Sequence, residues 1–166
     1  MRYESVSGPR EEFVSFYEAA KDDCLRAVIV SVGDVDIAED LVAEAFARAW
    51  ATWNRVVRHP VPRAWIVRTA LNVHISSWRR HGRPIVPNRP SDLAYREDPA
   101  TEPFDPALMD RLRKLPARQR EVIALRVFLD LDTAQTGEIL GISPGTVTAH
   151  LARAVAALRT DYVESK

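Results

Sequence analysis

The sequence predicts an all-α protein with two small helical domains, the second a helix-turn-helix, joined by a Pro-rich acidic linker. Three observations lead to this fold class. No alternation of apolar and polar residues is long enough to indicate a β-strand. Apolar residues instead recur at spacings of three and four, as in amphipathic helices. Six of the 11 prolines fall between residues 84 and 106, among Ser, Asp, Glu and Asn.

The expected division is a first domain over 1–83, a linker over 84–106 and a second domain over 107–166. At about 3.1 Å per residue, the extended linker spans roughly 70 Å. The first domain is expected to hold helices at about 11–31, 36–53 and 63–81, with a loop over 54–63. Its expected core residues are Phe13, Phe16, Tyr17, Ala20, Cys24, Ala27 and Val28, then Leu41, Val42, Ala45, Phe46, Ala49, Trp50 and Trp53, then Val67, Leu71, Ile75 and Trp78.

The second domain shows a series of helix start and stop signals. A cap is a polar side chain that accepts a hydrogen bond from one of the free backbone N–H groups at the start of a helix. Proline is well suited to the first position of a helix. The expected elements are a start at Asp105-Pro106, a helix over 116–128 with Val122, Ile123, Leu125 and Val127 apolar, a short helix from a Thr133 cap to Leu140, a stop at Gly141, and a helix from Ser143-Pro144 to about Leu158 or Tyr162.

The net charge of zero conceals strong segregation along the chain. Residues 11–54 carry a net charge of −7, residues 55–89 carry +8 with no acid, residues 90–110 carry −5, and residues 111–166 carry +3. Arginine supplies 20 of the 23 positive side chains, and its guanidinium suits phosphates and bases. Such blocks are typical of separate faces for separate partners, although charge runs are also often just solvated surface.

Several function classes are excluded. No apolar run is long enough to span a bilayer, and the polar N-terminus is not a secretory signal, so a cytoplasmic protein without membrane insertion is expected. One cysteine, Cys24, rules out an internal disulfide and a thiolate-rich zinc site. Neither a glycine-rich phosphate loop nor a nucleophile motif is present. We therefore expect no catalytic residues, no metal and no cofactor.

The short helix, the turn at Gly141 and the helix that follows match a helix-turn-helix. In the last helix, one apolar stripe runs through Val147, Leu151, Val155 and Leu158. The other face offers small and polar residues that allow close approach to base edges and can bond bases or phosphates. An amphipathic hairpin within a helical bundle is the alternative interpretation.

Two further faces carry the segregated charge. The helix at 63–81 bears a polar, basic stripe suited to a phosphate backbone, with Asn72 placed to read a base edge. The loop before it, with Arg55, Arg58 and His59, is a candidate pocket for an extruded base. Trp65 is expected to pack rather than stack on a base. The second helix presents acids that suit a basic protein surface and repel DNA.

At these residues the chain resembles extracytoplasmic-function sigma factors. The first domain resembles theirs over Phe13 to Arg83, including Ala38-Glu39-Asp40-Leu41-Val42-Ala43-Glu44-Ala45-Phe46 and Pro62-Arg63-Ala64-Trp65-Ile66. The second resembles theirs over Leu112 to Leu158, including Leu115-Pro116, Leu140-Gly141-Ile142-Ser143 and Gly145-Thr146-Val147. Two motif sets in this order are more specific than either alone.

The resemblance implies a dissociable subunit that directs core RNA polymerase to promoters, while polymerase does the chemistry. Expected partners are the clamp helices of the largest polymerase subunit, the flap of the second largest, and promoter DNA; many relatives also have an anti-sigma protein. The implied sites are polymerase-binding Asp36, Glu39, Asp40 and Glu44; −10 element residues Arg55, Arg58, Arg68, Asn72, Ser76, Arg79, Arg80 and Arg83; and −35 element residues Ser143, Gly145, Thr146, Thr148, Ala149, His150 and Arg153.

The chain departs from the family pattern at a few positions. Gln usually precedes Glu44, where Ala43 stands, and Gln135-Thr136-Gly137 replaces a usual Glu-Ile-Ala. Thr and Gly there are expected to weaken core packing and helix formation, by about 1 kcal/mol for the Gly. Two alternatives stay open at this point: a stand-alone helix-turn-helix regulator, and a polymerase- or regulator-binding protein that has lost promoter recognition.

Overall fold

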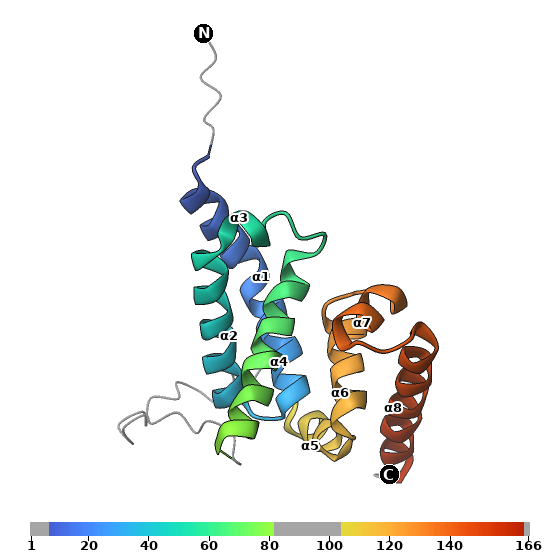
Figure 1. Ribbon diagram of the computed structural model, residues 1–166. Helices are drawn as coiled ribbons and strands as arrows, with labels where there is room; N and C mark the ends of the chain where they lie inside the picture. Colours follow the sequence, from blue (N-terminus) through green and yellow to red (C-terminus); the bar gives the residue numbers. More distant parts are fainter. Residues whose placement is uncertain (1–6, 82–103, 165–166) are drawn as a thin grey trace, which may run out of the picture.

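A computed structural model describes residues 7–81 and 104–164, and all regular structure in these ranges is helical, in two domains (Figure 1). None of the described helices is long and apolar enough to cross a membrane. The linker expected at 84–106 lies outside the described residues except for 104–106. The helices are α1 (Pro9–Val32), α2 (Val35–Ala51), α3 (Trp53–Val56) and α4 (Pro62–His81), then α5 (Pro106–Lys114), α6 (Ala117–Ile123), the π-helical turn η2 (Ala124–Phe128), α7 (Thr133–Leu140) and α8 (Pro144–Glu164).

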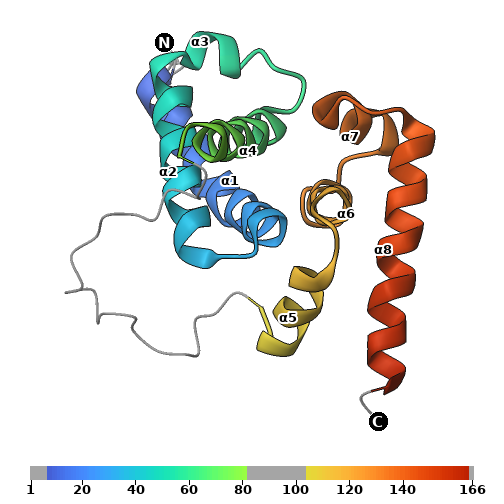
Figure 2. The ribbon, with the colours of Figure 1, turned by 60° about the horizontal axis from the view of Figure 1, so that its bottom comes forward.

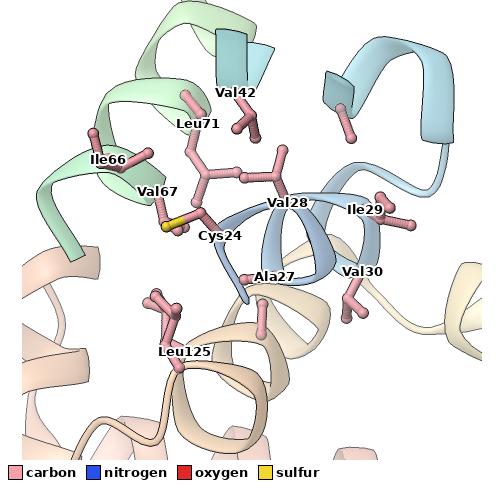
Figure 3. Close-up of a cluster of buried hydrophobic side chains, with 14 of the residues drawn as sticks. Cys24, Ala27, Val28, Ile29, Val30, Val42, Ile66, Val67, Leu71 and Leu125 are labelled. Carbon is pink, nitrogen blue, oxygen red and sulfur yellow. The ribbon is translucent and has the colours of Figure 1, made fainter. Parts of the chain in front are cut away.

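Helix α1 is covered on two sides, by α2 and α4 of its own domain and by α6 and η2 of the second (Figure 2). Residues 27–31 are all buried, although successive residues of a helix point about 100° apart. Figure 3 shows Val28 pointing toward Leu71 of α4, while Val30 points away from it, toward the second domain. One continuous apolar core therefore serves both domains.

The end of α2 differs from the sequence prediction. Thr52 ends the helix, and a new turn, α3, starts at Trp53 and runs into the expected loop 54–63. The Trp53 ring is buried between Phe13 and Phe16, at centroid distances of 5.2 Å from each. Trp50, expected in the core, is 48% exposed, because it lies in the last turn of α2 and contacts only the edge of this aromatic cluster.

Three more expected core residues are largely exposed: Tyr17, Ile75 and Trp78. Two four-residue steps carry Ile75 about 80° around the helix from Val67, which takes it off the core face. Trp78 lies in the last turn of α4 and is 50% exposed. Tyr17 packs edge-on against Phe46, and Lys21 Nζ lies over its ring, 5.6 Å from the centroid.

The second domain also corrects two local predictions. Val127 is 61% exposed, because η2 adds one residue to the turn and rotates it off the apolar face. The cap of α7 is Asp132 rather than Thr133: its carboxylate accepts from the Gln135 amide at 2.7 Å, and the Gln135 side chain accepts from the Asp132 amide at 3.0 Å. The predicted stop at Gly141 is confirmed, with φ 67°.

Gly137 has a packing role that the sequence prediction missed. A Cβ at this position would lie 2.6 Å from the carbonyl oxygen of Ile142, inside van der Waals contact. The approach is close because the amide of Ile142 donates to the Gly137 carbonyl at 3.0 Å, which closes the turn between α7 and α8. The expectation that Gly137 weakens packing is therefore wrong. Thr136 beside it is fully buried, and its hydroxyl has no hydrogen-bond partner among the described residues.

We predict that Gly137→Ala destabilises the chain, although Ala gains about 1 kcal/mol of helix propensity. The added methyl must displace backbone, which costs about 1–3 kcal/mol. Urea unfolding followed by circular dichroism measures the difference. Gly145→Ala is the matched control, because a Cβ there meets only the Ser143 hydroxyl, at 4.0 Å. A more stable Gly137→Ala chain would contradict the packing role.

Candidate protein and nucleic-acid interfaces

The first candidate surface is the acidic face of α2, formed by Asp36, Glu39, Asp40 and Glu44. Three of these side chains are exposed and Asp40 is half-buried. Glu44 pairs with Arg48 one turn later, with 3.0 Å between Oε1 and Nε. The face starts at the helix N-terminus, where the macrodipole stabilises negative charge. The acids are thus gathered on one helix, as the sequence predicted.

The second surface is the basic stripe of α4, which comprises Arg68, Asn72, Ser76, Arg79 and Arg80. All five side chains are exposed. Arg55 and Arg58 are exposed as well, on α3 and the turn after it, whereas Arg83 lies outside the described residues. His59 forms a hydrogen bond within its own turn, in which its Nδ1 accepts from the Val61 backbone N–H at 3.1 Å.

Two neighbours of the stripe, Arg63 and Trp65, differ in what they do. Arg63 at the start of α4 pairs with Asp23 of α1 at 3.0 Å, so it holds the two helices together. Trp65 is half-buried beside residues of α7, in agreement with packing rather than open stacking.

A cavity of about 430 Å³ joins the acidic face to the basic stripe. The sequence did not predict this juxtaposition, because only the packing of α2 on α4 creates it. Arg48, four residues after Glu44, was also missed as part of the site. The cavity is lined by Ile37, Asp40, Leu41, Glu44 and Arg48 of α2, and by Asn72, Val73, His74, Ser76, Ser77 and Arg80 of α4.

His74 lies between this cavity and the second domain. Burial lowers its pKa below the ordinary value, Arg120 of α6 lowers it further, and Glu121 acts in the opposite direction. Because the folded state disfavours the imidazolium, stability falls as the pH drops through the unfolded-state pKa of about 6.5.

The third surface is the helix-turn-helix of α7 and α8. Ser143 caps α8, its hydroxyl accepting from the Thr146 amide at 3.2 Å, which confirms the predicted start. Thr148 donates to the Pro144 carbonyl at 3.1 Å. Of the seven residues expected to contact the −35 element, five are exposed and two, Ala149 and His150, are half-buried.

No group of three or more His, Cys, Asp or Glu side chains that could hold a metal occurs in 7–81 or 104–164. Cys24 is fully buried in the core, and burial raises the pKa of its thiol to about 12. A thiol with this pKa carries almost no thiolate at neutral pH, so it has no nucleophilic role.

The chain matches known protein families. Residues 16–84 match the family Sigma-70 region 2, and residues 106–158 match Sigma-70, region 4. The RNA polymerase sigma-E factor of Streptomyces coelicolor is 32% identical over 92% of this chain and 86% of its own length. The ECF RNA polymerase sigma factor SigW of Bacillus subtilis is 26% identical over 92% and 89%.

Among solved structures, the sigma factor RpoE in complex with the anti-sigma factor NepR from Bartonella quintana has a TM-score of 0.70. It is 22% identical, over 90% of this chain and 96% of that one, a likeness that shows the fold. The chain therefore belongs to the sigma-70 family of RNA polymerase sigma factors, in its extracytoplasmic-function group. It acts in transcription initiation as a partner of core RNA polymerase, and a stand-alone regulator is not favoured.

We predict that Arg120→Ala raises the pKa of His74, because the loss of a nearby positive charge favours the imidazolium. An NMR pH titration measures this, with the His74 signal assigned from a His74→Gln spectrum. Arg120→Lys, which keeps the charge, is the control and should leave the pKa close to its wild-type value. An unchanged pKa in Arg120→Ala would show that the two side chains are apart in solution.

Proposed function

We propose that the acidic face of α2 docks on the clamp helices of the largest polymerase subunit, while the basic stripe of α4 melts and holds the −10 element. The observation that carries this proposal is the cavity between α2 and α4, around which the two oppositely charged surfaces meet. A basic partner on one side and a DNA strand on the other can then bind next to each other. The acids repel DNA from the polymerase-binding side.

Within this arrangement, Asn72 is proposed to contact a flipped base, and Arg68, Arg79 and Arg80 the phosphates around it. Arg55 and Arg58 extend the same basic surface along the strand. Arg83, outside the described residues, is proposed as a further contact. Asn72 is exposed in the middle of α4, where its amide can bond a base edge on both its donor and acceptor sides.

The helix-turn-helix is proposed to read the −35 element with α8 in the major groove, next to the flap of the second-largest subunit. The exposed residues Gly145, Thr148 and Arg153 are placed for close approach and for contact with bases or phosphates. Ser143 and Thr146 hold the start of the helix and can contact phosphate. Ala149 and His150 contribute less, because both are half-buried.

The division into 1–83, 84–106 and 107–166 is part of the proposal. So is the absence of catalysis by the chain itself: polymerase does the chemistry, in the cytoplasm, where bacterial DNA is transcribed. An anti-sigma protein is a proposed further partner, supported by the solved RpoE and CnrH structures, which are complexes with NepR and with the cytosolic domain of CnrY.

We predict that Glu39→Arg lowers promoter-specific transcription about threefold to tenfold by weakening core polymerase binding, through repulsion of a basic surface. Reconstituted transcription with purified core polymerase and a promoter library measures the loss, and affinity for core polymerase is measured alongside it. Glu18→Arg on the exposed side of α1 is the matched charge reversal and should behave as wild type. Equal loss in both variants would contradict the assignment of the acidic face.

Asn72→Ala is expected to leave polymerase affinity unchanged and to lower open-complex formation about tenfold or more, because one base contact is worth about 1–3 kcal/mol. Permanganate reactivity of melted thymines reports the open complex. Asn54→Ala, the same truncation on α3, is the control. A wild-type open complex in Asn72→Ala would remove Asn72 from the −10 site.

Arg153→Ala is expected to weaken binding of the polymerase complex to promoter duplex by about 1–3 kcal/mol and to relax selectivity at one base pair. Gel shifts on a set of −35 variants measure this. Arg159→Ala, also exposed on α8, should change affinity little and selectivity not at all. Identical effects of the two substitutions would point to a general charge effect instead of base reading.

A further inference from the structure

We propose that the cavity between α2 and α4 is a binding site for a free adenine nucleotide. The binding itself rests only on the cavity and on the side chains that line it. Its consequence, a block on the melted DNA strand, rests on the function proposed above, because the ligand covers part of the basic stripe.

The first argument is the character of the cavity wall. Its volume of about 430 Å³ lies in the range of small-molecule sites, which combine apolar lining with a few polar groups. Ile37 and Leu41 of α2 and Val73 of α4 supply apolar surface on which a flat ring can lie. The remaining lining side chains are polar or charged, and they come from the same two helices.

The second argument is a buried hydroxyl that has no partner. Ser77 lines the cavity and is only 5% exposed, and its Oγ has no hydrogen-bond partner among the described residues. A helical serine can donate to the carbonyl four residues earlier, as Ser31 does to Ala27 at 2.9 Å. Buried polar groups are nearly always paired, so the unpaired Ser77 hydroxyl indicates a partner that the described part of the chain does not supply.

The third argument is the charge around the cavity. Glu44 and Arg48 of α2 line it together with Arg80 of α4. Glu44 accepts from Arg48 at 3.0 Å, and its carboxylate has further acceptor sites for another donor. Arg80 can bind a phosphate with two parallel N–H donors. His74, also in the lining, adds no positive charge at neutral pH, because burial lowers its pKa below the ordinary 6.5.

These walls select the class of ligand. A purely anionic ligand would be repelled by Glu44, and a purely cationic one by Arg80. The ligand therefore carries N–H donors at one end and an anionic group at the other. An asparagine amide forms two hydrogen bonds with adenine, accepting from the 6-amine and donating to N7, and Asn72 lines this cavity. The second hydrogen of the amine is then available to Glu44, and the phosphate to Arg80.

The consequence follows from shared side chains. Asn72, Ser76 and Arg80 belong both to the cavity lining and to the basic stripe. A bound nucleotide occupies the side chains that the melted −10 strand would use, so nucleotide and strand exclude each other. We therefore expect the free nucleotide to lower open-complex formation.

The test titrates the full free chain with adenosine monophosphate (AMP), followed by calorimetry and by amide shifts in NMR spectra. Inosine monophosphate (IMP) is the matched ligand control, because it has an oxygen in place of the 6-amine. We expect saturable AMP binding, about fivefold or more tighter than IMP, because the IMP oxygen leaves Asn72 and Glu44 without a donor. The amide shifts should concentrate in the parts of α2 and α4 that line the cavity.

Three variants locate the ligand. Ser77→Ala is expected to weaken AMP binding about threefold to tenfold, the size of one hydrogen bond. Its thermal midpoint should not fall, because the hydroxyl has no bond to lose in the free chain. Arg80→Gln should weaken AMP but not adenosine, which lacks the phosphate. Arg79→Gln, an exposed neighbour on α4 outside the cavity lining, is the control and should bind AMP as wild type does.

Three results would each overturn the site: no saturable AMP binding at millimolar concentration, equal affinity for AMP and IMP, or wild-type AMP affinity in both Ser77→Ala and Arg80→Gln. Permanganate footprinting without other nucleotides tests the consequence. AMP that binds the cavity but neither lowers the open complex nor is displaced by single-stranded DNA would overturn the exclusion of the strand. The titration needs neither DNA nor polymerase, so a failure of the proposed function, seen as no open complex without AMP, is distinguishable from a failure of this inference.

Discussion

Residues 27–31 of α1 have no side that faces water, because the first domain packs on one face and the second domain on the other. A helix can be apolar all round only when it is buried all round. This shared helix joins two apolar clusters into one core. The packing of both domains on α1 also brings α4 beside α7 and His74 near Arg120. It places Arg113 where it donates to the Gly33 carbonyl, just after the end of α1.

Opposite charges are separated onto different helices of the first domain. The acids of α2 and the arginines of α4 lie in separate segments of the chain. The packing of α2 on α4 brings them to opposite sides of one cavity. Arg63 pairs with Asp23 of α1, so it serves the packing of two helices beside the basic stripe and is not part of that stripe.

The sequence was sufficient for the fold class and for most helix ends, because caps, prolines and glycines act locally. Ser143 and Gly141 illustrate this, since each is used as its residue type predicts. Trp50 was misplaced because a periodicity does not say where its own helix ends. Ile75 was misplaced because two four-residue steps rotate it about 80° from Val67. Gly137 was misread because the carbonyl it accommodates comes from the following turn. Contact between the domains was left open, although the unbroken apolar run 27–30 is the signal that would have predicted it.

The sequence also predicted part of the candidate site. The acidic face and the basic stripe were recognised from spacing and charge, and their exposure agrees with those roles. The cavity between them and the position of Arg68 beside α7 depend on tertiary packing, and no local pattern encodes either. Half-burial of His150 likewise follows from how α8 packs on α6 and α7.

The proposed function requires that the acidic face of α2 contacts core polymerase while the basic stripe of α4 contacts the melted −10 strand. Photocrosslinking from positions 39 and 72, both exposed, in the promoter complex with core polymerase tests this most directly. We predict that position 39 crosslinks to the largest polymerase subunit and position 72 to the −10 strand. A crosslink from position 39 to DNA, or from position 72 to polymerase alone, would contradict this assignment.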